Sequence, residues 1–358
     1  MIRFGCIDFG PNEREAIIDL IGPSDPQLTM GKRVYDFERS FAKWLGSKYA
    51  VMVNSGTSAL LTALHGLRIN QNIEGVGKVI QTTSLTYCAD WNALSLSGLS
   101  WEPRDVGDDF VMHLDDYDPA LDSCRDFLSV DLLGKPCRVT NLIDDASEAV
   151  GSKLQNRKMG THALCGTFSF YVAHIINTIE GGMVVTDDNE LYETFLSIRD
   201  NGRVCTCPVC TLKTQGKCSK RTNSSSIERR WETQHTGGNY KPTEIQGALG
   251  LVKMSKIDMI CKRRHDIYKR YFEEFKEMAE ESDEYIVPLA YPVKVKDPTK
   301  TLAYMEKQGV ECRGMFPAYS AAYKNAYRIS QSYILVPAHQ ELSDNDVEFI
   351  INSVKTCQ

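Results

Sequence analysis

Four cysteines stand close together in the segment CTCPVCTLKTQGKC. They are Cys205, Cys207, Cys210 and Cys218, and the Pro, Gly, Thr and Lys residues around them are typical of a loop. Four thiolates can enclose one tetrahedral zinc ion or one iron–sulfur cluster. The spacing suits a structural zinc knot equally well, so it does not separate the two metals. The residues that follow, to position 231, stay polar and basic, as an insertion would.

A second motif suits an anion. Residues 50–53 are predicted as a short buried strand, and the sequence Asn54-Ser55-Gly56-Thr57-Ser58 then leads into a helix that runs to about Leu67. Backbone N–H groups at the start of a helix hold an anion well, because the helix dipole and the unpaired donors point the same way. On these residues alone, an ordinary capped helix is the preferred interpretation.

Two further segments carry groups that can move or balance protons. A strand predicted at 141–145 ends in Asp144 and Asp145, where an acid is about as often a helix cap as a functional group. The segment from Thr167 to Asp188 is predicted as a strand end, a polar turn, a Gly-Gly turn and a second strand. Its turn contains His174. A histidine cannot form a lasting Schiff base, but it can transfer protons near neutral pH.

In this order, the Gly56 loop, the Asp145 segment and the Ser169-Phe170 pair resemble the DegT/DnrJ/EryC1/StrS sugar aminotransferases. The resemblance runs from Gly31 to the C-terminus and implies a pyridoxal-phosphate (PLP) enzyme of fold type I. The expected α/β architecture is a large domain with a mixed, mostly parallel seven-stranded sheet and a small C-terminal α/β domain. We therefore expect a large domain at 1–240 with a Cys-rich insertion at about 203–232, a linking helix at 241–275 and a small domain at 276–358.

The resemblance also implies roles for single residues. The phosphate of the cofactor would be bound by the Gly56 loop and Ser169, the ring would stack on Tyr87, and Asp145 would face the pyridine nitrogen. Glu148 replaces the glutamine that usually contacts the cofactor. The family's Asn reaches the phosphate of the neighbouring subunit, so Asn239 implies a homodimer with shared active sites, and Arg313 lies where the family contacts substrate. The implied cofactor-binding set is Gly56, Thr57, Ser58, Tyr87, Asp145, Glu148, Ser169 and Asn239.

One departure from the family decides the expected chemistry. The family's Schiff-base lysine stands five residues after the serine of the Ser-Phe pair, and this chain has His174 there. In this respect the chain resembles the 3-dehydrases of nucleotide-linked 4-keto-6-deoxyhexoses, which act in deoxysugar biosynthesis. The implied cofactor is pyridoxamine 5′-phosphate (PMP), held without a covalent bond. His174 would be the base, and the reaction would remove the C3 hydroxyl of the sugar.

The cysteine segment narrows the resemblance further. The CDP-sugar dehydrases of ascarylose-type pathways carry a [2Fe–2S] cluster in a Cys-rich insertion at this place, whereas the colitose-type GDP-sugar 3-dehydratases have the histidine and lack the cluster. This chain has Ser147 where the first branch has a further cysteine ligand, so we expect all four ligands to be local. We expect an iron–sulfur cluster, with zinc as the alternative, and a separate flavin or iron–sulfur reductase as a partner.

Three other interpretations remain open. The first is an aminotransferase that uses another lysine, with Lys153 and Lys158 nearest in sequence. The second is a non-catalytic, metal-binding regulatory protein on the same fold. The third is a dehydrase that acts on something other than a nucleotide sugar, which fold and cofactor do not exclude.

Composition places the chain among ordinary globular proteins. Of 358 residues, 42% are hydrophobic and 25% charged. The net charge of −6 argues against nucleic acid or an anionic membrane as a partner. No apolar run approaches the length of about 18 residues that a transmembrane helix needs. The N-terminal residues lack the pattern of a signal peptide, so we expect a cytoplasmic protein whose twelve cysteines are reduced thiols or metal ligands.

Overall fold

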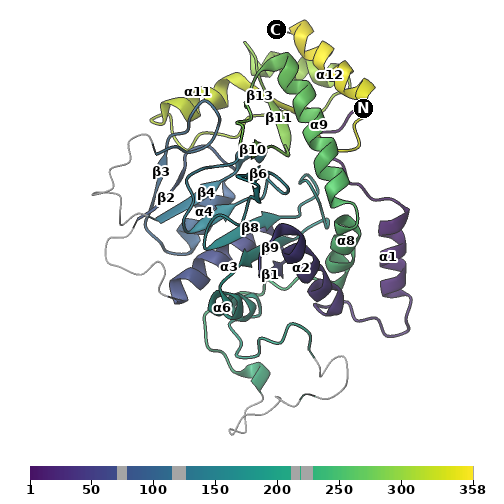
Figure 1. The fold of residues 1–358 in the computed structure, drawn as a ribbon, viewed down its shortest axis with the longest axis vertical. Coiled ribbons are helices and arrows are strands. Elements are labelled where there is room, and N and C mark those ends of the chain that lie inside the picture. Colours follow the sequence, from purple (N-terminus) through teal and green to yellow (C-terminus); the bar gives the residue numbers. More distant parts are fainter. Residues whose placement is uncertain (71–78, 115–125, 211–217, 219–228, 358) are drawn as a thin grey trace.

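The computed structural model describes residues 1–70, 79–114, 126–210, 218 and 229–357. At its centre is a seven-stranded sheet with the strand order β1-β9-β8-β5-β4-β2-β3 (Figure 1). Its strands are β1 (Tyr49–Val53), β2 (Ile80–Thr83), β3 (Trp101–Arg104), β4 (Asp126–Val130), β5 (Ile143–Asp145), β8 (Cys165–Ser169) and β9 (Gly182–Thr186). Only β9 runs antiparallel to its neighbours, so the predicted mixed, mostly parallel sheet is confirmed.

Hydrophobic residues alternate between the two faces of this sheet. In β1, Val51 and Val53 belong to the core on one face, while Ala50 and Met52 belong to the core on the other. Helices cover both faces, which is why the strands are buried on either side. They are α1 (Pro11–Ile21), α2 (Lys32–Leu45), α3 (Gly56–Ile69), α4 (Ala89–Leu96), α6 (Asn189–Arg199), α8 (Glu244–Met254) and α9 (Ile257–Phe275).

Aromatic rings fix the face that α2 covers. Phe41 of α2 lies 5.0 Å from Phe168 and 5.5 Å from Phe170, measured between ring centroids. Phe37, one turn earlier, lies 5.3 Å from Phe170. All four side chains are fully buried. Because Phe168 and Phe170 flank Ser169, this packing also sets the direction of the Ser169 side chain, which points to the opposite face.

The C-terminal part forms a smaller layer around a three-stranded antiparallel sheet, β11-β13-β12. Its elements are β11 (Ala290–Lys294), α10 (Pro298–Lys307), β12 (Arg313–Gly314), α11 (Lys324–Ser332), β13 (Tyr333–Pro337) and α12 (Asp344–Cys357). A third small sheet joins β10 (Glu284–Tyr285) to β6 (Lys153–Leu154) and β7 (Arg157–Lys158). The two ends of the chain lie near each other beside α12 (Figure 1).

Two details differ from the expected domain plan. The single long helix expected between the domains is two helices, α8 and α9, separated at Ser255 and Lys256. Lys256 has φ −126° and ψ 8°, outside the helical range, and its ammonium binds Asp8 and Glu13. The first residues also belong to the C-terminal layer, because Ile2 pairs with Val310 in a parallel bridge. No helix in the described ranges is long and apolar enough to cross a membrane.

A buried ion pair connects α2, β1 and the end of α6. Glu38 accepts hydrogen bonds from the Met52 N–H, at 2.8 Å, and from the Arg199 guanidinium, which also donates to the Met52 carbonyl at 2.9 Å. Glu38 and Arg199 are 3% and 1% exposed, so neither charge is solvated by water. Burial raises the pKa of Glu38, and Arg199 opposes that rise.

We therefore expect Arg199→Met to lower the free energy of unfolding by about 3–5 kcal/mol, because it leaves the Glu38 carboxyl buried without its cation. The matched control is Lys32→Met, which breaks the exposed Lys32–Asp36 pair and should cost at most about 1 kcal/mol. Urea denaturation at neutral pH measures both. Equal losses in the two variants would contradict this account of the buried pair.

Candidate active site

The predicted site residues meet at one edge of the central sheet. Strands β1, β8 and β5 run in the same direction, and their carboxyl ends lead directly to Gly56, Ser169 and Asp145. In the parallel register, Asp145 pairs with Val130 of β4 and with Thr167 of β8. The carboxyl ends of parallel strands are where open α/β sheets bind ligands. The sheet therefore positions the three motifs together although they are far apart in sequence.

The Gly56 loop and Ser169 touch each other. A Cβ atom added to Gly56 would lie 2.8 Å from the Cβ of Ser169, so only glycine fits against this strand end. A Cβ on Gly182, in the Gly-Gly turn, would lie 2.2 Å from the Ser55 carbonyl oxygen. The backbone N–H groups that open α3 therefore lie beside the Ser169 hydroxyl. This cradle has the donors that a phosphate group requires.

The remaining hydroxyl groups of the loop cap α3. The N-cap residue Ser55 accepts a hydrogen bond from the Ser58 N–H at 3.1 Å, and Ser58 Oγ donates to Asn54 Oδ1 at 2.7 Å. The Ser58 hydroxyl thus hydrogen-bonds within the loop. The capped start of α3 is also the place where the sequence predicts an anion site. Thr57 occupies the first turn of α3 next to Gly56.

Asp145 is held by three donors that all reach the same oxygen. Its Oδ1 accepts hydrogen bonds from the Ser147 N–H at 3.1 Å, from Ser147 Oγ at 2.6 Å and from Thr167 Oγ1 at 3.1 Å. The side chain is only 6% exposed. These contacts fix the carboxylate at the strand end. Asp145 does not cap a helix, because the Ser147 N–H that it binds belongs to a turn.

His174 lies next to the backbone of Ser147, the residue whose N–H and hydroxyl bind Asp145. Its side chain is half-buried, and its Nδ1 has no hydrogen-bond partner among the described residues. Burial lowers the pKa of the imidazole to about 4, partly opposed by the backbone of Ser147 and reinforced by the positive charge of Arg264. The neutral imidazole is therefore the form present at neutral pH, and this is the form that can accept a proton.

Tyr87 and Glu148 occupy different surroundings. Tyr87 is 60% exposed, and its ring lies 6.5 Å from that of Phe316, so one face is open to a stacking partner. Glu148 is 8% exposed and accepts a hydrogen bond from the Leu133 N–H at 2.7 Å. Burial raises the pKa of Glu148 to about 8, and the Asp145 charge adds to the rise. Glu148 is thus an uncharged acid at neutral pH, and in charge it is like the family's glutamine.

Asn239 and Arg313 lie at the surface. Asn239 is exposed, and its carbonyl accepts a hydrogen bond from Asn54 Nδ2 at 3.2 Å, immediately before the Gly56 loop. Arg313 is exposed on β12, where its guanidinium lies 4.7 Å from the ring centroid of Phe4. The structure thus places Asn239 beside the phosphate cradle, and it places Arg313 against the N-terminal segment.

The four cysteines do not converge on a metal site. Cys205, Cys207, Cys210 and Cys218 are half-buried, and the described residues contain no group of three or more His, Cys, Asp or Glu side chains that could hold a metal. The rest of the predicted insertion, at 211–217 and 219–228, lies outside the described residues. The two ends of the predicted insertion lie side by side. Arg203 forms a β-bridge with Thr233, and the Val204 N–H donates to the Glu232 carbonyl at 3.0 Å. In the described part of the chain, these thiols do not by themselves form the expected cluster site.

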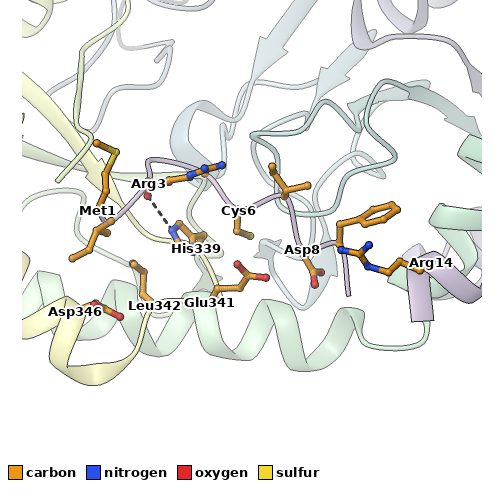
Figure 2. A pocket seen from close by; sticks show the side chains of 13 residues that line it. Met1, Arg3, Cys6, Asp8, Arg14, His339, Glu341, Leu342 and Asp346 are labelled. Carbon is orange, nitrogen blue, oxygen red and sulfur yellow. Dashed lines mark hydrogen bonds between the residues drawn. The ribbon is translucent and has the colours of Figure 1, made fainter. Parts of the chain in front are cut away.

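A cavity of about 690 Å³ lies away from the cofactor motifs. The N-terminal segment lines one side of it, and residues around His339 and Glu341 line the other (Figure 2). His339 Nε2 is hydrogen-bonded to the Arg3 carbonyl at 3.1 Å. None of the predicted cofactor residues lines this cavity. The N-terminal segment also touches the turn that contains His174, because a Cβ on Gly5 would lie 3.2 Å from Cα of Ala173.

The sequence interpretation missed a second buried acid beside Asp145. Asp90, in the first turn of α4, is 2% exposed, and its carboxyl group is within hydrogen-bonding reach of that of Asp145. An acid in the first turn of a helix is a common capping pattern, which hid its role. Only the approach of α4 to β5 in the folded chain reveals the pair.

The buried Glu148 gives a stability prediction. Glu148 is protonated in the folded chain up to about pH 8 but ionised in the unfolded chain above about pH 4.5, so the folded state binds more protons between those values. Stability contributed by this group is therefore lost as pH rises. Glu148→Gln cannot ionise, and its stability relative to the parent should increase between pH 5 and pH 8 by an amount on the order of 3 kcal/mol.

Urea denaturation of the cofactor-free protein at both pH values measures the difference, and the exposed Glu15→Gln is the control that should show none. A parent and a Glu148→Gln variant with the same pH dependence would contradict the raised pKa of Glu148.

Comparison with known proteins agrees with this geometry. The model of the DegT/DnrJ/EryC1/StrS aminotransferase family matches residues 12–355. A GDP-4-keto-6-deoxy-D-mannose 3-dehydratase of Escherichia coli is 30% identical over 265 residues, which are 70% of this chain and 67% of that protein. A UDP-4-amino-4,6-dideoxy-N-acetyl-beta-L-altrosamine transaminase of Helicobacter pylori is 27% identical over 387 residues, which are 98% of this chain and 95% of that protein.

Solved structures resemble the fold over the whole chain. The E. coli 3-dehydratase with bound hydrated PLP has a TM-score of 0.85 at 23% identity and covers 99% of both chains. The aminotransferase PseC of H. pylori has a TM-score of 0.82 at 25% identity and covers 99% of this chain and 98% of its own. Relatives of both activities are similarly close. This chain belongs to the DegT/DnrJ/EryC1/StrS aminotransferase family of sugar-modifying PLP enzymes and has their fold-type-I architecture.

Proposed function

We propose that this protein is a PMP-dependent dehydratase that removes the C3 hydroxyl of a nucleotide-linked 4-keto-6-deoxyhexose. The observation that carries the proposal is the place of His174. It stands at the family's lysine position, next to Ser147, which binds Asp145. A histidine there cannot store the cofactor as a Schiff base, but it can accept a proton. The similarity to the E. coli 3-dehydratase supports the same substrate class.

The other candidate activity needs a lysine near Asp145. Lys158 Nζ donates to the Trp44 carbonyl at 2.5 Å and lies 4.6 Å from the Trp44 ring centroid, on the α2 side of the molecule. Lys153 lies over the Tyr285 ring at 5.5 Å from its centroid. Both ammonium groups are thus engaged next to Trp44 and β10. Their contacts favour the dehydratase over an aminotransferase that uses one of these lysines.

The residues at the sheet edge suit PMP. Backbone N–H groups at Gly56 and Thr57, together with the Ser169 hydroxyl, would bind the phosphate, and the exposed ring of Tyr87 would stack on the pyridine. Asp145 would face the pyridine nitrogen, and neutral Glu148 would take the place of the usual glutamine. When bound, PMP supplies an amine for the C4 ketone and a pyridinium that takes up electron density. Asn239 would reach the phosphate of a partner subunit in a homodimer.

In this arrangement His174 moves two protons. As a neutral imidazole it accepts the proton from the C4′ carbon, the carbon that carries the cofactor's amine. The resulting imidazolium then donates a proton to the departing C3 hydroxyl group, which leaves as water. A carboxylate at Asp145 would face the pyridine nitrogen and favour a proton on it. Arg313, at the surface beside Phe4, remains the predicted substrate contact.

We expect His174→Asn to bind PMP and to lose exchange of the C4′ proton by about 10²-fold or more, as for removal of a general base. In the parent, exchange should be flat between pH 6 and pH 8 and should fall below about pH 5, because acid protonates the imidazole. Deuterium exchange followed by NMR measures both. The control Lys158→Gln should exchange normally, and unchanged exchange in His174→Asn would refute the assignment of the base.

A metal at the cysteine segment would decide the fate of the dehydrated sugar. To bind one, the four thiolates would have to move together from their described positions. Metal analysis with visible and EPR spectra, on protein purified without oxygen, is expected to find iron and a signal reducible by dithionite. Zinc, or no metal, would contradict the cluster and favour the hydrolytic route, in which ammonia is released and the amine is restored from an amino acid.

A further inference from the structure

A buried acid that the proposed mechanism does not use stands against the pyridine-facing carboxylate. Asp90 of α4 is 2% exposed. Thr86 Oγ1 donates to its Oδ2 at 2.8 Å, while its Oδ1 receives no hydrogen bond from any described residue. The carboxyl groups of Asp90 and Asp145 are within hydrogen-bonding reach of each other. Two carboxylates so close cannot both be ionised, so a single proton must lie between them.

The surroundings determine which of the two acids holds that proton. Three donors, from Ser147 and Thr167, reach Asp145 Oδ1 and stabilise a negative charge on Asp145. Asp90 has the Thr86 hydroxyl alone, and it is also close to the Glu148 carboxyl. Burial, first, and the neighbouring Asp145 charge, second, raise the pKa of Asp90 well above its ordinary value. The proton therefore belongs to Asp90.

We propose that Asp90 is a positioning residue that, as a neutral acid, donates a hydrogen bond to Asp145 and so keeps the negative charge on Asp145 opposite the pyridine nitrogen of the cofactor. This proposal rests on the cofactor site described under the proposed function. A hydrogen bond to the charged form of a group favours that form. Asp90 thereby opposes transfer of the pyridinium proton to Asp145, which the dry surroundings would otherwise favour.

The chemical consequence concerns the electron sink of the reaction. A pyridine nitrogen that keeps its proton withdraws electrons strongly, and one that shares its proton with Asp145 withdraws them less. Thr86 donates to Oδ2 of Asp90, while Oδ1 has no hydrogen-bond donor among the described residues and is free to carry the proton toward Asp145. An amide in place of the acid can still donate a hydrogen bond, whereas a methyl group cannot.

The test uses PMP labelled with ¹⁵N in the pyridine ring and bound to the full-length protein, with the ¹⁵N chemical shift as the readout. Asp90→Asn should keep the protonated-nitrogen shift of the parent. Asp90→Ala should move the shift toward the unprotonated value, with the ratio of the two proton positions changing about 10-fold, as expected for loss of one hydrogen bond to a charged group. Asn92→Ala, on the exposed side of α4, is the matched control and should have no effect.

Two further measurements keep the test decisive. If Asp90→Ala does not fold, Thr86→Val removes the donor that orients Asp90 and should move the ¹⁵N shift in the same direction. Infrared difference spectra of the cofactor-free protein should show a carboxylic-acid C=O band that Asp90→Asn removes.

An unchanged ¹⁵N shift in both Asp90→Ala and Thr86→Val, or the absence of that infrared band, would overturn the role of Asp90 and leave the proposed function intact. Failure of the parent protein itself to bind PMP would overturn the proposed function and this inference together.

Discussion

The burial of several carboxyl groups where the parallel strands end is the constraint on which the site depends. Asp145 and Asp90 form one close pair, and Asp131 and Asp144 form a second pair, also within hydrogen-bonding reach. Burial raises the pKa values of Asp131 and Asp144, as it does that of Asp90. Each pair must hold a proton, because two adjacent negative charges in a dry site are too costly. At this sheet edge three hydrogen-bond donors converge on Asp145, whereas burial raises the pKa values of Asp90, Asp131 and Asp144.

The second pair has a structural role that supports the first. Asp144 Oδ2 accepts the Gly160 N–H at 2.6 Å, and Asp131 Oδ1 accepts the Cys137 N–H at 2.8 Å, so each acid secures a loop that follows the sheet. Successive residues of a strand point to opposite faces. Asp144 therefore faces the Gly160 loop, and Asp145 faces the proposed cofactor site. Two neighbouring residues of the short strand β5 thus have different roles: Asp144 anchors a loop, and Asp145 belongs to the proposed site.

The same edge explains how one fold can support two chemistries. The proposed phosphate cradle, carboxylate and stacking ring would hold the cofactor in either case, and the residue at position 174 would determine whether the protein can bind it covalently. With histidine there, the pKa lowered to about 4 keeps the imidazole neutral at neutral pH, the form that can accept a proton. Lysines elsewhere do not replace the missing one, because the contacts of Lys153 and Lys158 lie with Tyr285 and Trp44.

Sequence alone determined the features that depend on local pattern. The Gly56 loop, the strand ending at Asp145 and the Ser169 segment each have a recognisable order, and the family that they resemble implied the mixed sheet that these motifs share. The family resemblance carried their expected roles, and the match over residues 12–355 confirmed the family. The expected single linking helix was wrong: the chain leaves the helix at Ser255 and Lys256, and Lys256 forms ion pairs with the distant Asp8 and Glu13.

Tertiary structure decided what depends on the approach of distant segments. Asp90 looks like an ordinary acid in the first turn of a helix until α4 brings it against Asp145. Glu148 looks like a charged replacement for glutamine until burial keeps its proton in place. The Cys205–Cys218 spacing predicts a metal, yet the described residues contain no group of three or more ligands, since spacing limits how far apart ligands can be but does not bring them together. Burial and the convergence of donors, which no local pattern encodes, set the charge of each group.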